Sequence, residues 1–234
     1  MTRKRQLPVP HRYTPGVTVA AIILSASSEG ALADTLGQPR VRRLADLAWS
    51  GGALPIVIVS PDPGGAVQAA LVGSEAIYAS PASPDPGPAG HMAHGAVLAL
   101  AEVRDTTAVL IWPARMAWVG PETITSLIEA HGSDPGAILR PAWQGAPGWP
   151  VLLPTAHLEA LRAVAADRMP PEVIADLLAA MASRIVEVGD PGVTHDVDTG
   201  YDALPVYEGP PDPLGGRSHE WGADVATEAG MTEP

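Results

Sequence analysis

Three carboxylates lie within seven residues near the end of the chain, in the segment 194–202, which reads THDVDTGYD. They belong to Asp196, Asp198 and Asp202. On a strand, Asp196 and Asp198 would point to the same face. Paired carboxylates of this kind hold Mg²⁺ when a substrate phosphate completes the coordination shell. A second interpretation makes Asp198 or Thr199 a helix cap.

A loop of small residues follows the first apolar segment of the chain. It begins with Ser25, Ala26, Ser27 and Ser28. Small residues let backbone N–H groups approach a phosphate closely, so this loop is a candidate phosphate cradle. The alternative is a Ser/Ala loop that binds nothing.

Two histidines and two tryptophans are further candidates. His91 and His94 are three residues apart and could share a metal, but because no third ligand is evident nearby, a role at the surface or at the start of a helix is favoured. We expect four tryptophans to fill the core and loops: Trp112, Trp118, Trp143 and Trp149. Of these, Trp143 and Trp149 flank a Gly-Ala-Pro-Gly turn and could also line a pocket.

These residues need a scaffold, and short apolar segments alternate with amphipathic ones along most of the chain. Strands are expected at residues 17–24, 55–60, 75–79, 107–112, 137–140, 149–153, 184–188 and 193–197, and helices at 40–50, 64–72, 92–103, 121–131, 155–166 and 171–183. Unbroken β-branched runs are typical of parallel strands covered on both faces. The alternation predicts an α/β fold, with a three-layer, doubly wound, mostly parallel, Rossmann-like sheet of about eight strands, any antiparallel strand lying at an edge. Ligands of such sheets bind beyond the C-terminal ends of the strands.

Composition excludes several classes of protein. The 234 residues include 26 acidic and 14 basic side chains, for a net charge of −12, which argues against a nucleic-acid binder. No apolar run approaches the ~20 residues of a membrane helix. Without cysteine there is no disulfide, thiolate metal site or cysteine nucleophile.

The ends of the chain differ in charge from the middle. Residues 1–12 carry four basic and no acidic side chains, whereas residues 208–234 carry six acidic side chains against one arginine. We expect a disordered basic segment over 1–15, one domain over 16–207 and a disordered acidic tail over 208–234. No apolar segment of signal-peptide type follows the basic start, so we expect a cytoplasmic protein.

Several segments, taken in order, match the motifs of one family. Residues 24–28 read LSASS, 36–40 LGQPR, 90–95 GHMAHG, 112–117 WPARMA, 121–123 PET, 141–153 PAWQGAPGWPVLL and 196–202 DVDTGYD. The ordered set, over about residues 17–204, resembles the MobA-like NTP transferase family. Within that family it looks most similar to the molybdenum cofactor cytidylyltransferase-like branch.

The resemblance implies transfer of a nucleoside monophosphate from an NTP, such as CTP or GTP, to a phosphorylated cofactor, with release of pyrophosphate and help from Mg²⁺. The family motifs make Ser25, Ala26, Ser27, Ser28, Gly37, Gly90 and Gly95 the residues expected to bind the nucleotide. They make Asp196 and Asp198 the expected metal ligands.

The departures from the family pattern fall on the catalytic parts. Ser27 stands where the family has a loop glycine, the loop carries an insertion, and Thr35 lies nearest the position of a family arginine. Arg40 replaces a lysine, and Arg115 replaces the metal-binding aspartate that follows the fourth strand. Arg40 and Arg115 are therefore the candidate catalytic residues of a degenerate site with weak or lost catalysis. A guanidinium repels Mg²⁺, although it can bind a phosphate directly.

Three functions remain open from the sequence. The chain could be an active nucleotidyltransferase with an unusual site. It could be a non-catalytic binding protein, such as an assembly partner of a molybdoenzyme. A sugar-nucleotide pyrophosphorylase would share the fold, but the THDVDT and Gly-x-Pro segments look more like the cofactor branch.

Overall fold

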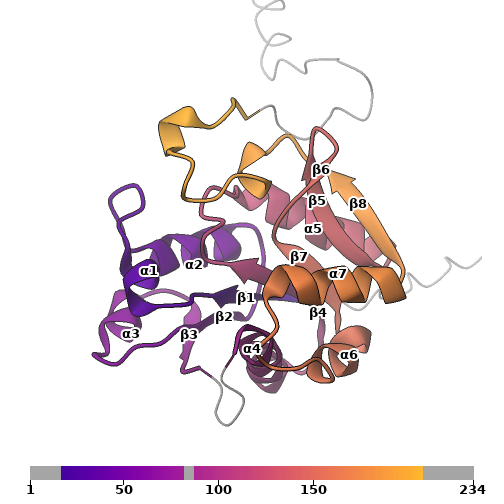
Figure 1. Ribbon diagram of the computed structural model, residues 1–234, viewed down its shortest axis with the longest axis horizontal. Coiled ribbons are helices and arrows are strands. Elements are labelled where there is room, and N and C mark those ends of the chain that lie inside the picture. Colours follow the sequence, from indigo (N-terminus) through magenta and orange to yellow (C-terminus); the bar gives the residue numbers. More distant parts are fainter. Residues whose placement is uncertain (1–16, 82–86, 208–234) are drawn as a thin grey trace, which may run out of the picture.

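The computed structural model describes residues 17–81 and 87–207. The segments expected to be disordered, residues 1–15 and 208–234, lie outside these ranges. Eight strands of the described residues form one sheet in the order β3-β2-β1-β4-β7-β5-β6, with β8 also pairing with β5 (Figure 1). The strands are β1 (Thr18–Leu24), β2 (Ile56–Val59), β3 (Ala76–Ala79), β4 (Thr106–Pro113), β5 (Ile138–Trp143), β6 (Ala146–Pro147), β7 (Val151–Pro154) and β8 (Ser183–Glu187).

Helices cover both faces of the sheet, which confirms the three-layer prediction (Figure 1). One apolar cluster joins the sheet to α1 (Ser28–Leu32), α2 (Arg40–Ser50), α3 (Ala66–Ala70) and α5 (Pro121–Ser133). A second cluster joins it to α4 (Pro88–Glu102), α6 (Leu158–Arg162) and α7 (Pro170–Ala180). None of the helices described here is long and apolar enough to cross a bilayer.

Strand β1 lies at the centre of the sheet and is buried on both faces. It pairs in parallel with β2 and β4, so that Leu24 is level with Val59 and Pro113. A Cβ atom at Gly95 would lie 2.4 Å from Cγ2 of Ile22, which shows how closely α4 packs on β1. The C-terminal ends of these parallel strands therefore meet at one edge, where the loop after β1 and the turn after β4 come together.

Four expectations about the elements need correction. The antiparallel strand β7 lies inside the sheet, between β4 and β5, rather than at an edge. Helix α4 begins at Pro88, in a favourable first-turn position for proline, and not at residue 92 as expected. Residues 25–37 contain the short helix α1. The helix expected at 155–166 is a 3₁₀ turn (Thr155–His157) followed by the short helix α6, which ends at Arg162.

Residues 193–197, expected as a strand, are a short 3₁₀ turn (Pro191–Val193) followed by irregular backbone. Their backbone groups bond to separate partners instead of to one neighbouring strand. Val193 accepts from the N–H of Trp149 at 2.9 Å, and Val197 donates to the carbonyl of Arg115 at 3.0 Å. Spaced valines alone suggested a strand, but this segment has no continuous partner.

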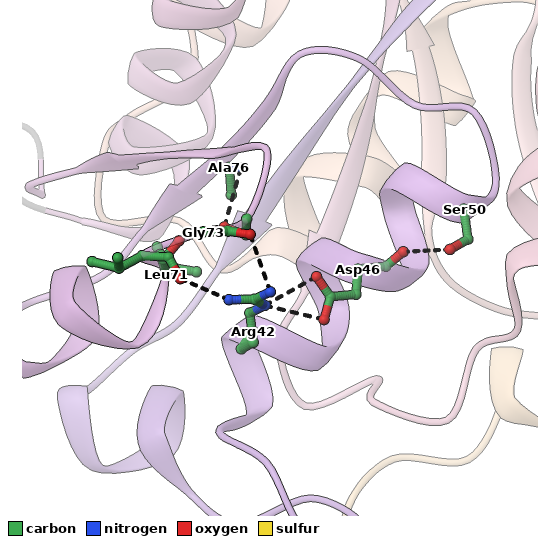
Figure 2. Close-up of polar contacts among 8 residues, drawn as sticks. Arg42, Asp46, Ser50, Leu71, Gly73 and Ala76 are labelled. Carbon is green, nitrogen blue, oxygen red and sulfur yellow. Dashed lines mark hydrogen bonds and ion pairs between the residues drawn. The ribbon is translucent and has the colours of Figure 1, made fainter.

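Helix α2 is fastened to the turn before β3 by one arginine. Arg42 forms an ion pair with Asp46 at 3.0 Å, and its guanidinium donates to the carbonyl oxygens of Val72 at 2.9 Å and Gly73 at 3.2 Å (Figure 2). These contacts fix the direction of the helix whose first residue, Arg40, lies close to the candidate site described next.

Candidate functional site

Arg115, two residues after the end of β4, forms ion pairs with both carboxylates of the late segment. Its Nε lies 3.2 Å and its Nη2 2.9 Å from Oδ2 of Asp196. The same Nη2 also pairs with Oδ2 of Asp198. Asp196 and Asp198 do come together as expected, but the cation between them is a side chain of the protein.

A turn, and not a strand, orients these carboxylates. The N–H of Asp198 donates to Oδ1 of Asp196 at 2.9 Å. Trp118 closes the turn from behind, since its indole N–H donates to the carbonyl oxygens of Asp196 at 2.9 Å and Thr199 at 3.0 Å. The ring of Tyr201 packs against Trp118, with the ring centroids 5.5 Å apart. The sequence suggested only that Trp118 fills the core or a loop, because no local pattern shows which carbonyl groups its indole N–H will meet.

The ionisation of the cluster follows from these contacts. Partial burial alone would raise the pKa of Asp196, but the hydrogen bond from the Asp198 N–H and the Arg115 guanidinium outweigh it and hold that pKa below its ordinary value. The hydrogen bond and charge of Asp196, with the charge of Asp198, raise the pKa of Arg115. Both shifts favour the charged forms, so the ion pairs persist at neutral pH.

Arg40 brings a second cation to the same region. Burial, and then the charge of Arg115, lower the pKa of Arg40, while the charge of Asp196 acts in the opposite direction. Its Nε donates to Oγ1 of Thr35 at 3.4 Å. Thr35, the residue nearest to the position of the family arginine, therefore supports the neighbouring cation instead of supplying one.

The residues around Arg115 do not fit a divalent metal. Both aspartates are already engaged by its guanidinium. Within residues 17–81 and 87–207, no group of three or more His, Cys, Asp or Glu side chains is arranged to hold a metal ion. His91 and His94 likewise acquire no third ligand from the described part of the chain.

A cavity of about 500 Å³ opens beside this cluster, at the C-terminal ends of β1 and β4. Its polar lining consists of Ser25, His91, Arg115 and Asp196, and its apolar lining includes Leu24, Pro88, Pro113, Met116, Trp149 and Met169. Its volume lies within the ~300–1,000 Å³ of small-molecule sites. The cavity thus has an apolar body and a charged end.

The expected nucleotide-binding residues divide into two groups. Ser25 and Ala26 line the cavity. The others lie outside its lining: Ser27 caps α1 by accepting from the Gly30 N–H at 3.0 Å, Ser28 begins that helix, Gly37 is exposed in a turn at φ +85°, and Gly90 and Gly95 lie within α4. Trp149 lines the cavity as expected, whereas Trp143 does not.

Two contributions to the cavity were missed from the sequence. His91 was interpreted as a helix-start residue, but in the first turns of α4 it also lines the cavity. Met169, Pro170 and Pro171 come from the start of α7, far along the chain, and no motif signalled them. Only the packing of α7 beside α4 brings them to the end of β1.

Several solved structures share the fold of this chain. The chain is similar to 4-diphosphocytidyl-2C-methyl-D-erythritol synthase from Anaerococcus prevotii, with 13% identity, a TM-score of 0.61, and coverage of 80% of this chain and 93% of that one. A manganese complex of Rv0371c from Mycobacterium tuberculosis is 16% identical, with a TM-score of 0.57 and coverage of 74% of this chain and 89% of that one. Molybdopterin-guanine dinucleotide biosynthesis protein A from Archaeoglobus fulgidus is 13% identical, with a TM-score of 0.52 and coverage of 72% of this chain and 83% of that one. The fold is therefore that of the nucleotidyltransferases.

The sequence narrows this class to one family. The family profile of the MobA-like NTP transferase domain matches residues 28–186. The chain belongs to the MobA-like NTP transferase domain family. Comparison with curated proteins found no matching relative.

Proposed function

We propose that this chain binds a nucleoside triphosphate in the cavity beside β1 and β4, without a divalent metal, and that its nucleotidyl transfer is weak or lost. The observation that carries the proposal is the Arg115 guanidinium held between Asp196 and Asp198. In this arrangement a protein cation stands where the family motif has a metal-binding aspartate, and it is paired with the two aspartates expected as the other metal ligands.

The charge arithmetic supports a site without metal. Replacing an aspartate by Arg115 changes the local charge by two units. Even at the dielectric constant of water, the interaction energy between a unit charge and a divalent ion about 4 Å away is roughly 2 kcal/mol. Two units correspond to roughly 4 kcal/mol, or about a thousandfold in metal affinity.

The same arginine can serve the nucleotide instead. Among the described residues, Nη1 of Arg115 has no hydrogen-bond partner, so it is free to donate to a phosphate oxygen. Ser25 and Ala26 lie in the lining of the same cavity, and Arg40 adds positive charge close by. We expect CTP or GTP as the ligand, since the similar structures include a diphosphocytidyl synthase and a guanine dinucleotide biosynthesis protein.

Two finer functions follow from the family resemblance. The similarity to a molybdopterin-guanine dinucleotide biosynthesis protein supports either residual transfer to a phosphorylated cofactor or a non-catalytic role as assembly partner of a molybdoenzyme. Both would place the protein in the cytoplasm. The ion pairs at Arg115 favour the non-catalytic role.

The proposal is tested by calorimetric titration with CTP, GTP and ATP in EDTA, together with a pyrophosphate-release assay containing Mg²⁺, the bound nucleotide and molybdopterin. We expect one nucleotide to bind without metal and little or no pyrophosphate to appear. Rapid Mg²⁺-dependent release would show an active transferase. Failure of all three nucleotides to bind would overturn the nucleotide-binding proposal.

A further inference from the structure

Trp149 is a partly exposed tryptophan in the wall of the cavity beside β1 and β4. It lies two residues before β7, whose first residue, Val151, is opposite Ile111 in the antiparallel pair with β4. Because the two strands run in opposite directions, Trp149 lies toward the end of β4 that Arg115 follows. An aromatic side chain and a charged one are therefore placed at the same end of one strand pair.

The backbone of Trp149 is held against the segment that carries the aspartates. Its N–H donates to the carbonyl oxygen of Val193 at 2.9 Å. Gly148 packs so closely there that a Cβ atom would lie 2.0 Å from the same oxygen. Asp196, three residues after Val193, pairs with Arg115. The fold thus fixes the position of Trp149 relative to this ion pair, as in a largely preformed ligand site.

The indole N–H of Trp149 has no structural task, in contrast to those of two other tryptophans near the site. Trp112 donates to the carbonyl oxygen of Met116 at 2.8 Å, and Trp118 holds the aspartate turn. The N–H of Trp149 makes no hydrogen bond to the described residues and is not one of their shielded unpaired polar atoms, so it is open to solvent. The ring packs in part against both apolar clusters, and its remaining surface contributes to the cavity.

We propose that Trp149 is a specificity-determining residue whose ring stacks on the nucleobase, while the phosphates lie toward Arg115. This inference rests on the proposed nucleotide binding and adds the part of the ligand that Trp149 contacts. Every nucleobase has a flat face that can stack on an aromatic side chain. Met116, Met169 and Pro170 make the neighbouring lining apolar, which suits the body of a base. The contact lets the site distinguish a nucleotide from a phosphate chain that carries no base.

The test is calorimetry in EDTA on the wild type, Trp149→Leu and Trp149→Phe, using CTP, GTP and base-free tripolyphosphate. We expect Trp149→Leu to weaken the preferred nucleotide by about tenfold, as for the loss of one base–aromatic stack. Trp149→Phe should lose less, because phenylalanine still presents a ring. Tripolyphosphate should bind all three proteins equally.

Trp143→Leu is the matched control. Trp143 packs edge-on against His195, beside Asp196, but it lies outside the cavity lining. We expect this variant to bind every ligand like the wild type. Because Trp149 also packs against the core, tryptophan fluorescence provides a second measurement that does not depend on the leucine variant folding. The nucleotide should quench the wild type, tripolyphosphate should not, and Trp149→Phe should lose most of the quenching.

The outcomes separate this inference from the function on which it rests. If the wild type binds a nucleotide, and the Trp149 variants match it in affinity and in quenching, the role of Trp149 is refuted and nucleotide binding stands. An equal loss for tripolyphosphate, or for Trp143→Leu, would show that Trp149 acts by holding the aspartate segment, which also refutes stacking. If the wild type binds no nucleotide, both proposals fall together.

Discussion

At the scale of the residue, the presence of Arg115 where the family motif has an aspartate decides which ligand the end of β4 can bind. The sequence alone predicted that a cation would lie where the family has a metal ligand. The structure adds that this cation is already satisfied by Asp196 and Asp198. That could not be predicted, because the two aspartates lie about 80 residues further along the chain.

The titration of Asp196 gives a residue-scale prediction. Because its pKa is lowered in the folded protein, the ion pair with Arg115 contributes fully above the ordinary aspartate pKa of ~3.9 and is lost as the pH falls through the lower folded value. In Arg115→Ala, the carboxylate loses its partner and keeps Asp198 nearby, so its pKa should rise. Carboxyl-detected NMR titration measures both values. Equal pKa values in the two proteins would show that Arg115 does not bind Asp196 in solution.

At the scale of the element, the alternation of apolar and amphipathic segments predicted nearly every strand and helix. It did so because buried parallel strands and amphipathic helices have different hydrophobic periods. The prediction failed at residues 193–197, where tertiary contacts replace strand pairing. The preceding residue Asp190 is buried and accepts from the Gly120 N–H at 2.8 Å and from Thr123 at 2.7 Å. It thereby ties this segment to the start of α5, a link that no local pattern reveals.

Trp118 gives a prediction for the turn that carries the aspartates. Trp118→Phe keeps an aromatic ring but removes the N–H that bonds to Asp196 and Thr199. We expect a loss of about 1–2 kcal/mol in the free energy of unfolding, measured by urea denaturation. Trp49→Phe is the matched control, since Trp49 is half exposed and its N–H makes no hydrogen bond to the described residues. If both variants lose the same stability, the hydrogen bonds of Trp118 do not hold the turn.

At the scale of the whole molecule, the cavity is a product of packing between distant segments. It lies at the C-terminal ends of β1 and β4, the edge at which ligands of parallel sheets generally bind. The sequence did not predict the contribution of α7, because the approach of α7 to α4 depends on side-chain packing across one whole face. The motif glycines of residues 90–95 suggested a binding turn, yet they lie in a helix that packs on β1.

Gly95 allows a test of that packing. A methyl group there would lie 2.4 Å from Ile22 and 3.2 Å from Val59, so α4 must shift away from the sheet. We expect Gly95→Ala to lower the free energy of unfolding by about 1–3 kcal/mol despite the better helix propensity of alanine. Gly136→Ala, where the new methyl group meets no atom within 4 Å, should change it little. Equal effects in chemical denaturation would mean that α4 is less tightly packed than described.

The extent of the folding unit is a further prediction at this scale. Both apolar clusters lie within the described residues, so a fragment of residues 16–207 should fold alone. We expect its thermal midpoint and its nucleotide affinity to match those of the full chain. A fragment that melts many degrees lower would show that the basic or acidic end contributes to stability.

The central claim is that Arg115 takes the place of a metal ion, and the most direct measurement is the effect of Mg²⁺ on nucleotide affinity. Calorimetry would compare the affinity with Mg²⁺ and with EDTA for the wild type, Arg115→Asp and Arg104→Asp. Arg104 is exposed and lies before β4, so Arg104→Asp controls for the change in net charge. For the wild type and Arg104→Asp, we predict that the affinity measured with Mg²⁺ equals the affinity measured with EDTA. For Arg115→Asp, we predict at least tenfold tighter binding with Mg²⁺ than with EDTA. A wild type whose affinity rises steeply with Mg²⁺ would contradict the claim.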